Sequence, residues 1–323
     1  MSERWSGDAQ TWRGLPPAGR ISGDAWMTIG SFDGVHRGHQ HLLHRLSAGA
    51  ARAGAAAVVV TFDPHPRCVV DPGRCPALLT TLDERVRLLS RSGVQHVVIM
   101  PFTDELAAWS AERFCAALLE TINVRRIAVG PGFALGRGRS GDASFLRDYG
   151  ASHGFDVEIV APAMRGGAVV SSTRVRSALR EGRIAEARNL LGRHYALSGS
   201  VVSGERRGRV LGFPTANLSV DTARSIPAHG VYASWARIAN KQYEAATSIG
   251  IRPTFGSSTE TIETHLLDFD GDLYGEDLEV AFVRRLRGER RFAGAPQLVE
   301  QMRRDVAATR RTLTASPSRW AAV

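Results

Sequence analysis

The sequence GSFDGVHRGH at residues 30–39 carries two histidines, His36 and His39, on a turn rich in glycine. A short apolar run at residues 26–29 precedes the turn, and apolar side chains recur at helical spacing over residues 42–50. This order predicts a strand, a turn and a helix, with both imidazoles on one helical face beside open backbone N–H groups. Such a turn suits attack at the α-phosphate of a nucleoside triphosphate. The alternatives for a bare HxxH pair are metal ligands or ordinary surface residues.

Four further strand patterns follow, at residues 57–62, 97–100, 126–129 and 157–160, and helical patterns lie between them. This alternation predicts an α/β fold with a doubly wound parallel sheet, whose ligands bind at the carboxyl ends of the strands. Three motifs fall at such ends: GSFDGVHRGH, TFDPHP at residues 61–66, and GPGFALGRGRSGD at residues 130–142.

The segment SSTRVRSAL at residues 171–179 reads as the start of another helix. Ser172 or Thr173 is expected to cap it, because a hydroxyl satisfies the free backbone N–H groups of the first turn. Arg174 and Arg176 then lie near a positive helix end, an arrangement that binds polyphosphate. Taken alone, the segment favours a capped surface helix, and its combination with the histidine turn favours phosphate binding.

The pattern changes near residue 195. Strand-like segments at residues 196–202, 230–238, 261–269 and 278–283 are separated by turns rich in Gly, Pro and Ser. A helical pattern covers residues 297–313. The segment predicts a small antiparallel β-barrel closed by a C-terminal helix. We therefore expect a first domain at residues 10–182, a linker helix within residues 183–194 and a second domain at residues 195–315.

The segment SGERRGRVLGFPTANL at residues 203–218 is a candidate phosphate loop of the second domain. Gly204, Gly208 and Gly212 make it flexible, and the oxygens of Thr215 and Asn217 suit a Mg²⁺ ion held with phosphates. A glycine-rich hairpin with no ligand explains the spacing equally well.

Glu263, in TIETHLLDFDGDLYG, is a candidate general base. A strand here puts Glu263 on one face with His265, Leu267 and Phe269, and a carboxylate on a largely apolar face is costly unless it is paired or functional. We expect Asp268, Asp270 and Asp272 to shape turns rather than to bind ligands.

The bulk composition of the 323 residues is that of a globular protein, with 43% hydrophobic and 23% charged residues. No apolar stretch approaches a membrane span, and the N-terminus lacks the pattern of a secretory signal, so the cytoplasm is the expected location. The three cysteines, Cys68, Cys75 and Cys115, are odd in number and lack CxxC spacing, which predicts neither a disulfide framework nor a zinc site.

The formal charge of +9 comes almost entirely from scattered arginines, with one cluster at residues 284–291. No aromatic-rich RNA-binding pattern or finger spacing accompanies them. Anionic small substrates such as ATP explain the charge as well as nucleic acid does. In the absence of a nucleic-acid-binding pattern, we expect small-molecule substrates and neither a nucleic-acid nor a membrane partner. Weak homo-oligomerisation stays open.

Taken together, the motifs resemble the prokaryotic bifunctional riboflavin kinase/FAD synthetase family. The order GSFDGVHRGH, TFDPHP, SSTRVR, GRVLGFPTANL and ETHLLDFDGDLYG carries the resemblance, which runs from about Gln10 to Leu313. It implies an N-terminal nucleotidylyltransferase domain that transfers AMP from ATP to FMN and releases pyrophosphate. It also implies a C-terminal β-barrel kinase domain that makes this FMN from riboflavin and ATP, with Mg²⁺ as cofactor.

The resemblance also assigns roles. His36 and His39 stabilise charge on the α-phosphate, Thr215 and Asn217 match a magnesium-binding PTAN element, and Glu263 matches the base for the riboflavin 5′-hydroxyl. The remaining candidates bind ATP or its phosphates, at Gly30, Phe32, Gly34, Ser172, Thr173, Arg176, Gly204, Gly208 and Gly212, or bind the flavin, at Asp63, Phe133 and Arg291.

One loop departs from the family pattern. The family usually has Asp or Asn before the Phe of the loop at residues 130–136, and this chain has Gly132 there. Losing a hydrogen bond to a charged group costs about 1.5–3 kcal/mol, which corresponds to a roughly ten- to 150-fold effect. Two alternatives to the bifunctional enzyme follow: a riboflavin kinase whose adenylyltransferase half is impaired or altered in specificity, and a flavin-binding regulator without turnover.

Overall fold

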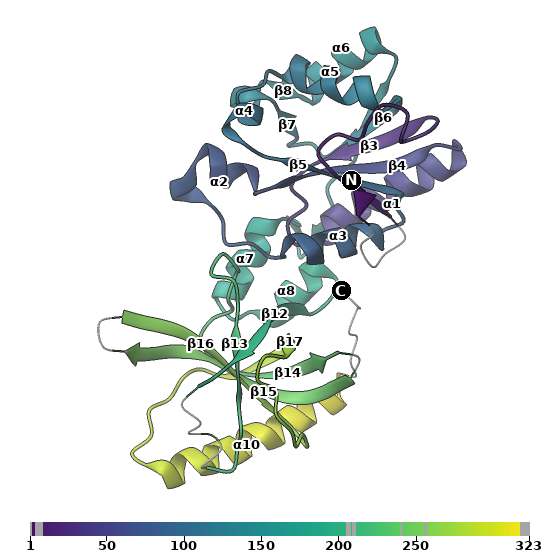
Figure 1. Ribbon diagram of the computed structural model, residues 1–323. Helices are drawn as coiled ribbons and strands as arrows, with labels where there is room; N and C mark the ends of the chain where they lie inside the picture. Colours follow the sequence, from purple (N-terminus) through teal and green to yellow (C-terminus); the bar gives the residue numbers. More distant parts are fainter. Residues whose placement is uncertain are drawn as a thin grey trace. The chain divides into compact units, whose positions relative to one another are not determined.

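The computed structural model describes residues 2–3, 9–204, 208, 211–239, 241–254 and 257–316. The chain forms two compact units that meet in the sequence between Ser172 and Thr173. Each unit is described separately below, with the element labels of Figure 1.

The first unit is built on a seven-stranded sheet in the order β1-β2-β5-β4-β3-β6-β9. Its outermost strand β1 is antiparallel to β2, and the other neighbours are parallel. The strands are β1 (Ser2–Glu3), β2 (Gln10–Arg13), β3 (Ala25–Ile29), β4 (Ala56–Asp63), β5 (His96–Pro101), β6 (Val124–Val129) and β9 (Asp156–Ile159). The five strands predicted in this part of the sequence are confirmed within one or two residues at most ends. β2 was not predicted.

Helices cover both faces of this sheet (Figure 1). On one face, α1 (Arg37–Arg52) and α3 (Leu82–Ser90) pack on buried residues such as Val59 and Val97. On the other, α5 (Ala111–Thr121) and α6 (Ala143–His153) pack on residues such as Val58 and Val98. Because alternate residues of a strand point to opposite faces, near-continuous apolar runs are what a sheet covered on both sides requires. The predicted doubly wound sheet is therefore confirmed.

Smaller elements complete the unit. They are α2 (Pro66–Val70), the 3₁₀ turns η1 (Pro72–Arg74) and η2 (Arg137–Arg139), α4 (Asp104–Ala107), and the short pairs β7 (Ala134–Leu135) with β8 (Gly141–Asp142) and β10 (Met164–Arg165) with β11 (Ala168–Val169).

The topology of the sheet fixes where a ligand binds. The chain leaves β3 into α1 on one face, and it leaves the neighbouring strand β6 toward α6 on the other. Adjacent strands whose connections diverge in this way open a crevice at their carboxyl ends. The residue 30–39 turn follows β3 and the residue 130–136 loop follows β6, so both border this crevice.

The cysteine prediction was wrong in one respect, because Cys68 and Cys75 form a disulfide. Cys68 lies in α2 and Cys75 follows η1, and the reversal of the chain between them brings their Cα atoms to 4.2 Å. This proximity arises from the local turn and leaves no trace in the cysteine spacing. Cys115 is a buried free thiol.

The second unit is a closed antiparallel barrel in the order β12-β13-β16-β15-β14-β17. Its elements are α7 (Ser172–Arg180), which begins at the last residue of the first unit, α8 (Ile184–Leu191), β12 (Tyr195–Val202), β13 (Ala216–Ser219), β14 (Gly230–Ile238), β15 (Lys241–Thr254), β16 (Ser257–Leu266), β17 (Asp277–Arg287) and α10 (Ala295–Thr314). α10 lies across β14, β15 and β17, where Leu313 packs with Ala233 and Val283 (Figure 1). The predicted barrel with a C-terminal helix is confirmed, whereas β13 and β15 were not predicted.

Among the helices of the described residues, none combines the length and apolar character needed to cross a lipid bilayer.

Candidate active sites

The histidine pair occupies the turn where β3 gives way to α1. His36 is the N-cap of α1, and its Nδ1 accepts a hydrogen bond from the backbone N–H of His39 at 3.3 Å. The two imidazole rings stack, with centroids 3.7 Å apart and planes inclined by 14°. Burial, and secondly the neighbouring His36, lower the pKa of His39 well below its ordinary value. His39 is therefore a neutral imidazole at pH 7, able to donate one N–H to a phosphate oxygen.

The turn before the pair holds a backbone that few residues adopt. Phe32 and Val35 have φ angles of +49° and +35°, and Gly34 has +82°. A side chain on Gly34 would also bring its Cβ within 2.7 Å of the Leu79 side chain, so only glycine fits. Positive φ at a β-branched residue such as Val35 costs free energy, and such strain concentrates at functional sites.

A buried carboxylate holds this turn in place. Asp33 is 1% exposed, and its carboxylate accepts hydrogen bonds from the backbone N–H groups of Leu79 and Thr80 at 2.9 and 3.1 Å and from the Thr80 hydroxyl at 3.2 Å. The Thr80 hydroxyl oxygen in turn accepts the N–H of Gly34 at 3.1 Å. The Ser172 hydroxyl donates to the backbone carbonyl of Asp33 at 2.8 Å. The strained turn is thus tied to two distant segments of the chain.

Asp63 lies at the end of β4, beside a buried arginine. Arg85, 5% exposed, donates from Nη1 to the backbone carbonyl of Ser31 at 2.8 Å, and its Nη2 lies 3.6 Å from Asp63 Oδ1. The Thr61 hydroxyl donates to the same Ser31 carbonyl at 3.2 Å. Burial lowers the pKa of Arg85, against the opposing effects of Asp33 and Asp63. Arg85 therefore joins the histidine turn to the candidate flavin residue.

The remaining candidates near the histidines lie in the same turn. The backbone N–H of Gly30 donates to Val60 of β4 at 3.0 Å. The Phe32 ring packs edge-on against His39, with centroids 5.0 Å apart. The structure therefore brings His36, His39, Gly30, Phe32 and Gly34 together.

The loop at residues 130–136 contains Gly132 and Phe133. Gly132 is exposed, its carbonyl accepts a hydrogen bond from Arg139 at 3.1 Å, and a Cβ added there would meet no atom within 4 Å. Phe133 is half-buried against the core beneath α5 and α6. The position of the missing Asp or Asn is therefore sterically open to a larger residue.

The capping prediction for residues 172 and 173 was wrong, because α7 begins at Ser172. Ser172 and Thr173 are the first two helical residues, and the Ser172 hydroxyl bonds Asp33 instead of capping the helix. In the second unit, Arg174 donates from Nε to Glu186 of α8 at 3.0 Å. Arg176 lies one turn into α7.

The kinase candidates meet across two barrel strands. Asn217 of β13 is paired directly with Glu263 of β16, and Glu263 is paired on its other side with Ser248 of β15. Residues directly opposite in antiparallel strands have Cβ atoms about 4.5–5.5 Å apart and point to the same face. The register therefore sets the Asn217 amide beside the Glu263 carboxylate, with Thr215 two residues away along the chain.

Two of the three loop glycines press against these residues. A Cβ on Gly204 would lie 2.2 Å from Nδ2 of Asn217, and a Cβ on Gly208 would lie 2.3 Å from the Phe213 carbonyl and 3.3 Å from Oγ1 of Thr215. The Gly208 carbonyl accepts the backbone N–H of Phe213 at 2.8 Å. Gly212 has a φ of +85°, and a Cβ added there would meet no atom within 4 Å, so this position needs glycine for its backbone conformation and not for close packing. Residues 205–207 and 209–210 of the predicted loop lie outside the described residues.

Glu263 lies on a strand, as predicted, but the expectation that this strand places it on a largely apolar face with Leu267 and Phe269 was wrong. β16 ends at Leu266, so Leu267 and Phe269 do not continue its face. The buried face of β16 carries Ile262, Thr264 and Leu266, and Glu263 lies on the opposite, half-exposed face with His265. His265 shares a 2.8 Å hydrogen bond with the Pro214 carbonyl, which fixes the chain just before Thr215.

A cavity of about 320 Å³ lies near the start of β13 and the end of β16, lined by Thr215, by Ala216, by Leu266 and by the segment from Phe269 to Tyr274 among others, and Glu263 is not part of its wall. Asp272 accepts the backbone N–H of Tyr274 at 3.1 Å and so shapes the turn, as predicted. Asp268 has a φ of +55° and pairs with Arg310 of α10 at 2.8 Å. Arg291 is exposed between β17 and α10.

The sequence did not point to Asp33, Thr80 or Arg85. The signals that exist are the Asp inside GSFDG and the capping box of α3, in which Thr81 and Glu84 exchange hydrogen bonds. Neither signal shows that residues about 50 positions apart meet around one turn.

Two family models match separate parts of the chain. The model described as FAD synthetase matches residues 20–174, and the model described as riboflavin kinase matches residues 191–313. Each match contains one of the two residue clusters described above.

Curated relatives cover both parts at once. The chain is 39% identical over 281 residues to the bifunctional riboflavin kinase/FMN adenylyltransferase of Escherichia coli K12, covering 86% of this chain and 90% of the relative. It is 40% identical over 285 residues to the Pseudomonas fluorescens enzyme of the same name, covering 88% and 91%. The Bacillus subtilis enzyme of that name is 31% identical over 283 residues, covering 86% and 89%.

A solved structure agrees along the chain. A crystal structure described as a macrolide-efflux protein from Streptococcus pneumoniae has a TM-score of 0.85 and 32% identity, covering 93% of this chain and 98% of that one. Its similarity supports the same arrangement of elements in both halves. With two family models in order and relatives above 30% identity over most of its length, the chain belongs to the bifunctional riboflavin kinase/FMN adenylyltransferase family.

Proposed function

We propose that this protein phosphorylates riboflavin to FMN in its barrel and adenylylates FMN to FAD in its sheet unit, using ATP in both steps. The observation that carries the proposal is the presence of one cluster of chemistry-bearing residues in each unit: the stacked His36 and His39 in the first, and the paired Asn217 and Glu263 in the second. Each cluster lies within the part of the chain that matches the corresponding family model.

In the adenylyl step, an oxygen of the FMN phosphate attacks the α-phosphorus of ATP, and the bond to the departing pyrophosphate breaks. Negative charge builds on the α-phosphate oxygens, where His36 and His39 donate hydrogen bonds. The backbone N–H groups at the start of α1 add the positive end of the helix dipole. We assign binding of the outgoing pyrophosphate to Ser172, Thr173 and Arg176, and binding of the FMN to Asp63 and Phe133.

In the kinase step, Glu263 removes the proton of the riboflavin 5′-hydroxyl as its oxygen attacks the γ-phosphorus of ATP, and ADP leaves. Gly204, Gly208 and Gly212 allow the loop to approach the phosphates closely. We assign the flavin contact in this unit to Arg291.

The donor set of the barrel site fits Mg²⁺. Thr215 and Asn217 offer a hydroxyl and an amide oxygen, which are hard ligands, and Gly204 and Gly208 leave free the space that their side chains would fill beside these two residues. The bound ion would neutralise charge on the transferring phosphate. Thr215 and Asn217 would supply side-chain oxygens to the ion, and Glu263 removes the proton of the riboflavin 5′-hydroxyl.

The two alternatives are less well supported. Both family models match, and the curated relatives carry both activities in their names, which does not favour a kinase with an impaired partner domain or a regulator without turnover. Gly132 in place of the family's usual Asp or Asn is expected to lower the rate of the adenylyl step, but it does not change which reaction we assign to this unit.

The test is to incubate the purified protein with Mg-ATP and either riboflavin or FMN and to separate the flavins by chromatography. We expect FMN and then FAD from riboflavin, and FAD from supplied FMN. FMN without any FAD would overturn the bifunctional proposal in favour of the kinase alone, and no product from either substrate would favour the regulator.

A further inference from the structure

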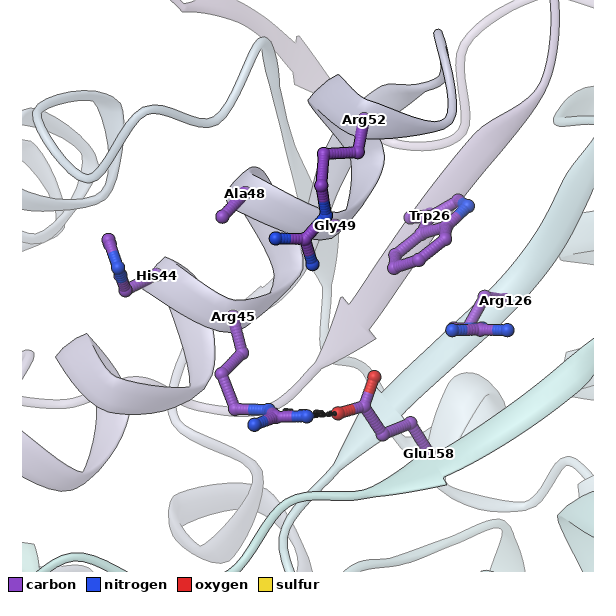
Figure 2. A pocket seen from close by; sticks show the side chains of 8 residues that line it. All are labelled: Trp26, His44, Arg45, Ala48, Gly49, Arg52, Arg126 and Glu158. Carbon is purple, nitrogen blue, oxygen red and sulfur yellow. Dashed lines mark hydrogen bonds and ion pairs between the residues drawn. The ribbon is translucent and has the colours of Figure 1, made fainter.

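Another cavity, with charged side chains around it, lies in the sheet unit where α1 passes over β3, β6 and β9. It has a volume of about 320 Å³, and its walls come from one helix and three strands (Figure 2). The lining residues are Trp26 of β3, Arg126 of β6, Glu158 of β9, and His44, Arg45, Ala48, Gly49 and Arg52 of α1.

This cavity shares no lining residue with the histidine turn. His36 and His39 lie at the N-terminal end of α1, whereas the cavity is lined by residues from His44 to Arg52. At 1.5 Å per residue, these residues lie about 8 to 20 Å along the helix axis from His39. Trp26 and Arg126 are register partners near the amino ends of β3 and β6, away from the carboxyl ends that border the crevice. The cavity therefore belongs to neither proposed active site.

Positive charge is in excess around the cavity. Three guanidinium groups line it against one carboxylate, Glu158. Even with Asp156, which pairs with Arg126 at 3.0 Å, one positive charge is uncompensated. The guanidinium of Arg52 has no hydrogen bond or ion pair to any residue that the structure describes. An anionic ligand would supply the missing partner.

Two of the guanidinium groups are already oriented. Arg45 donates from Nε and Nη2 to one oxygen of Glu158, at 2.9 and 2.5 Å. The Arg126 guanidinium lies over the Trp26 ring, 4.3 Å from its centroid. The Trp26 ring also lies so close to α1 that a Cβ on Gly49 would be 2.1 Å from it. Because these groups are held before a ligand arrives, binding costs less ordering of side chains.

The chemistry of the ligand follows from these groups. Guanidinium groups bind phosphate and carboxylate oxygens through parallel hydrogen bonds. A single carboxylate would engage one arginine, whereas the uncompensated charge of Arg52 together with the remaining N–H donors of Arg45 and Arg126 suits a compact anion with several oxygens. We propose that this cavity is a binding site for a polyphosphate, either free pyrophosphate or the phosphate tail of a nucleotide.

The test follows the indole N–H signal of Trp26 by NMR in protein labelled with ¹⁵N on tryptophan, with the signal identified by its loss in Trp26→Phe. Pyrophosphate and ATP are titrated separately without Mg²⁺, up to about 10 mM. We expect a saturable shift of the Trp26 signal with pyrophosphate, and with ATP as well if the site takes a nucleotide tail. In Arg45→Gln/Arg52→Gln the apparent Kd should rise at least roughly tenfold, because two charged hydrogen-bond donors are lost.

Arg20→Gln, which removes an exposed arginine of the same unit outside the cavity, is the matched control and should keep the wild-type titration. The proposal is overturned if Trp26 shows no saturable shift, if the double variant titrates like wild type, or if sodium chloride at equal ionic strength gives the same shift. The readout is local to Trp26, so failure of this proposal is distinguishable from failure of the flavin activities.

Discussion

The two candidate active sites are built in different ways. The site of the sheet unit lies in loops after strands, and its shape depends on residues far apart in the sequence: Asp33 bonds Leu79 and Thr80, and Arg85 bonds Ser31. The site of the barrel lies on the strands, where the register sets Asn217 opposite Glu263. A loop site needs buried polar anchors to hold it, whereas a strand site takes its geometry from the backbone ladder. We therefore expect the site of the sheet unit to lose activity when a buried anchor is removed. We expect the barrel site to lose activity when a reacting group or a residue packed against it is changed.

The largest expected effect is on the barrel. Glu263→Gln should lower the rate of FMN formation by at least roughly 100-fold, since an amide cannot accept the hydroxyl proton. FAD formation from supplied FMN should be unchanged. Chromatography of both reactions measures the two rates.

Glu260→Gln is the control, because Glu260 lies on the same strand and shares a 3.0 Å hydrogen bond with His229. It should leave both rates within about twofold, a change of roughly 0.4 kcal/mol. Equal losses in both steps for Glu263→Gln, in folded protein, would contradict the separation of the two sites.

The anchors of the loop site are tested next. Arg85→Met removes a charged donor from the Ser31 carbonyl and from beside Asp63, and should slow FAD formation roughly ten- to 150-fold. The fold should survive, because the Ser31 carbonyl keeps the hydrogen bond from Thr61. Rates of FAD and FMN formation and a thermal melt provide the measurements.

Arg87→Met, two residues along the same helix, serves as the comparison and should retain FAD formation. If Arg85→Met kept the wild-type rate, the idea that distant anchors shape this site would be wrong.

A smaller effect is expected from close packing in the barrel. Gly204→Ala forces the Asn217 amide to move, since the added Cβ would lie 2.2 Å from Nδ2. We expect a two- to roughly tenfold loss of kinase rate, the size of one displaced hydrogen bond. Gly275→Asn makes a suitable control, because Gly275 has a φ of +80° and no neighbour within 4 Å of an added Cβ. Similar rates for the two variants would argue against a role for the contact between Gly204 and Asn217.

The smallest expected effect concerns pH. Burial and His36 hold the pKa of His39 below its ordinary 6.5, so the unfolded chain binds a proton that the folded chain does not. The stability from neutral His39 is complete above about pH 6.5 and is lost as the pH falls toward its folded pKa. Denaturation at pH 7.5 and 5.5 should therefore show a smaller pH difference in His39→Gln than in wild type. A pH difference in His39→Gln as large as in wild type would exclude this effect.

The sequence predicts much of this architecture, because periodicity reports burial. α8 runs from Ile184 to Leu191 and β14 from Gly230 to Ile238, as predicted, since both bury a regular apolar face. β15 escaped notice because its inward residues include Ala245 and Thr247, which fill a narrow barrel without forming an apolar pattern. The anchors Asp33 and Arg85, and the disulfide, depend on tertiary contacts that leave no local signal.

The closure of the barrel has a consequence for biosynthesis. β12 pairs with β17 from Tyr195 opposite Phe282, so the first and last strands of the barrel are neighbours. The barrel cannot close until the ribosome has synthesised the chain as far as Arg287, the last residue of β17. Every strand of the parallel sheet has been synthesised once the chain reaches Ile159. Domains generally fold as units during synthesis, the N-terminal one first. A nascent chain of this protein therefore acquires the architecture of its adenylyl-transferring half well before that of the half that makes FMN.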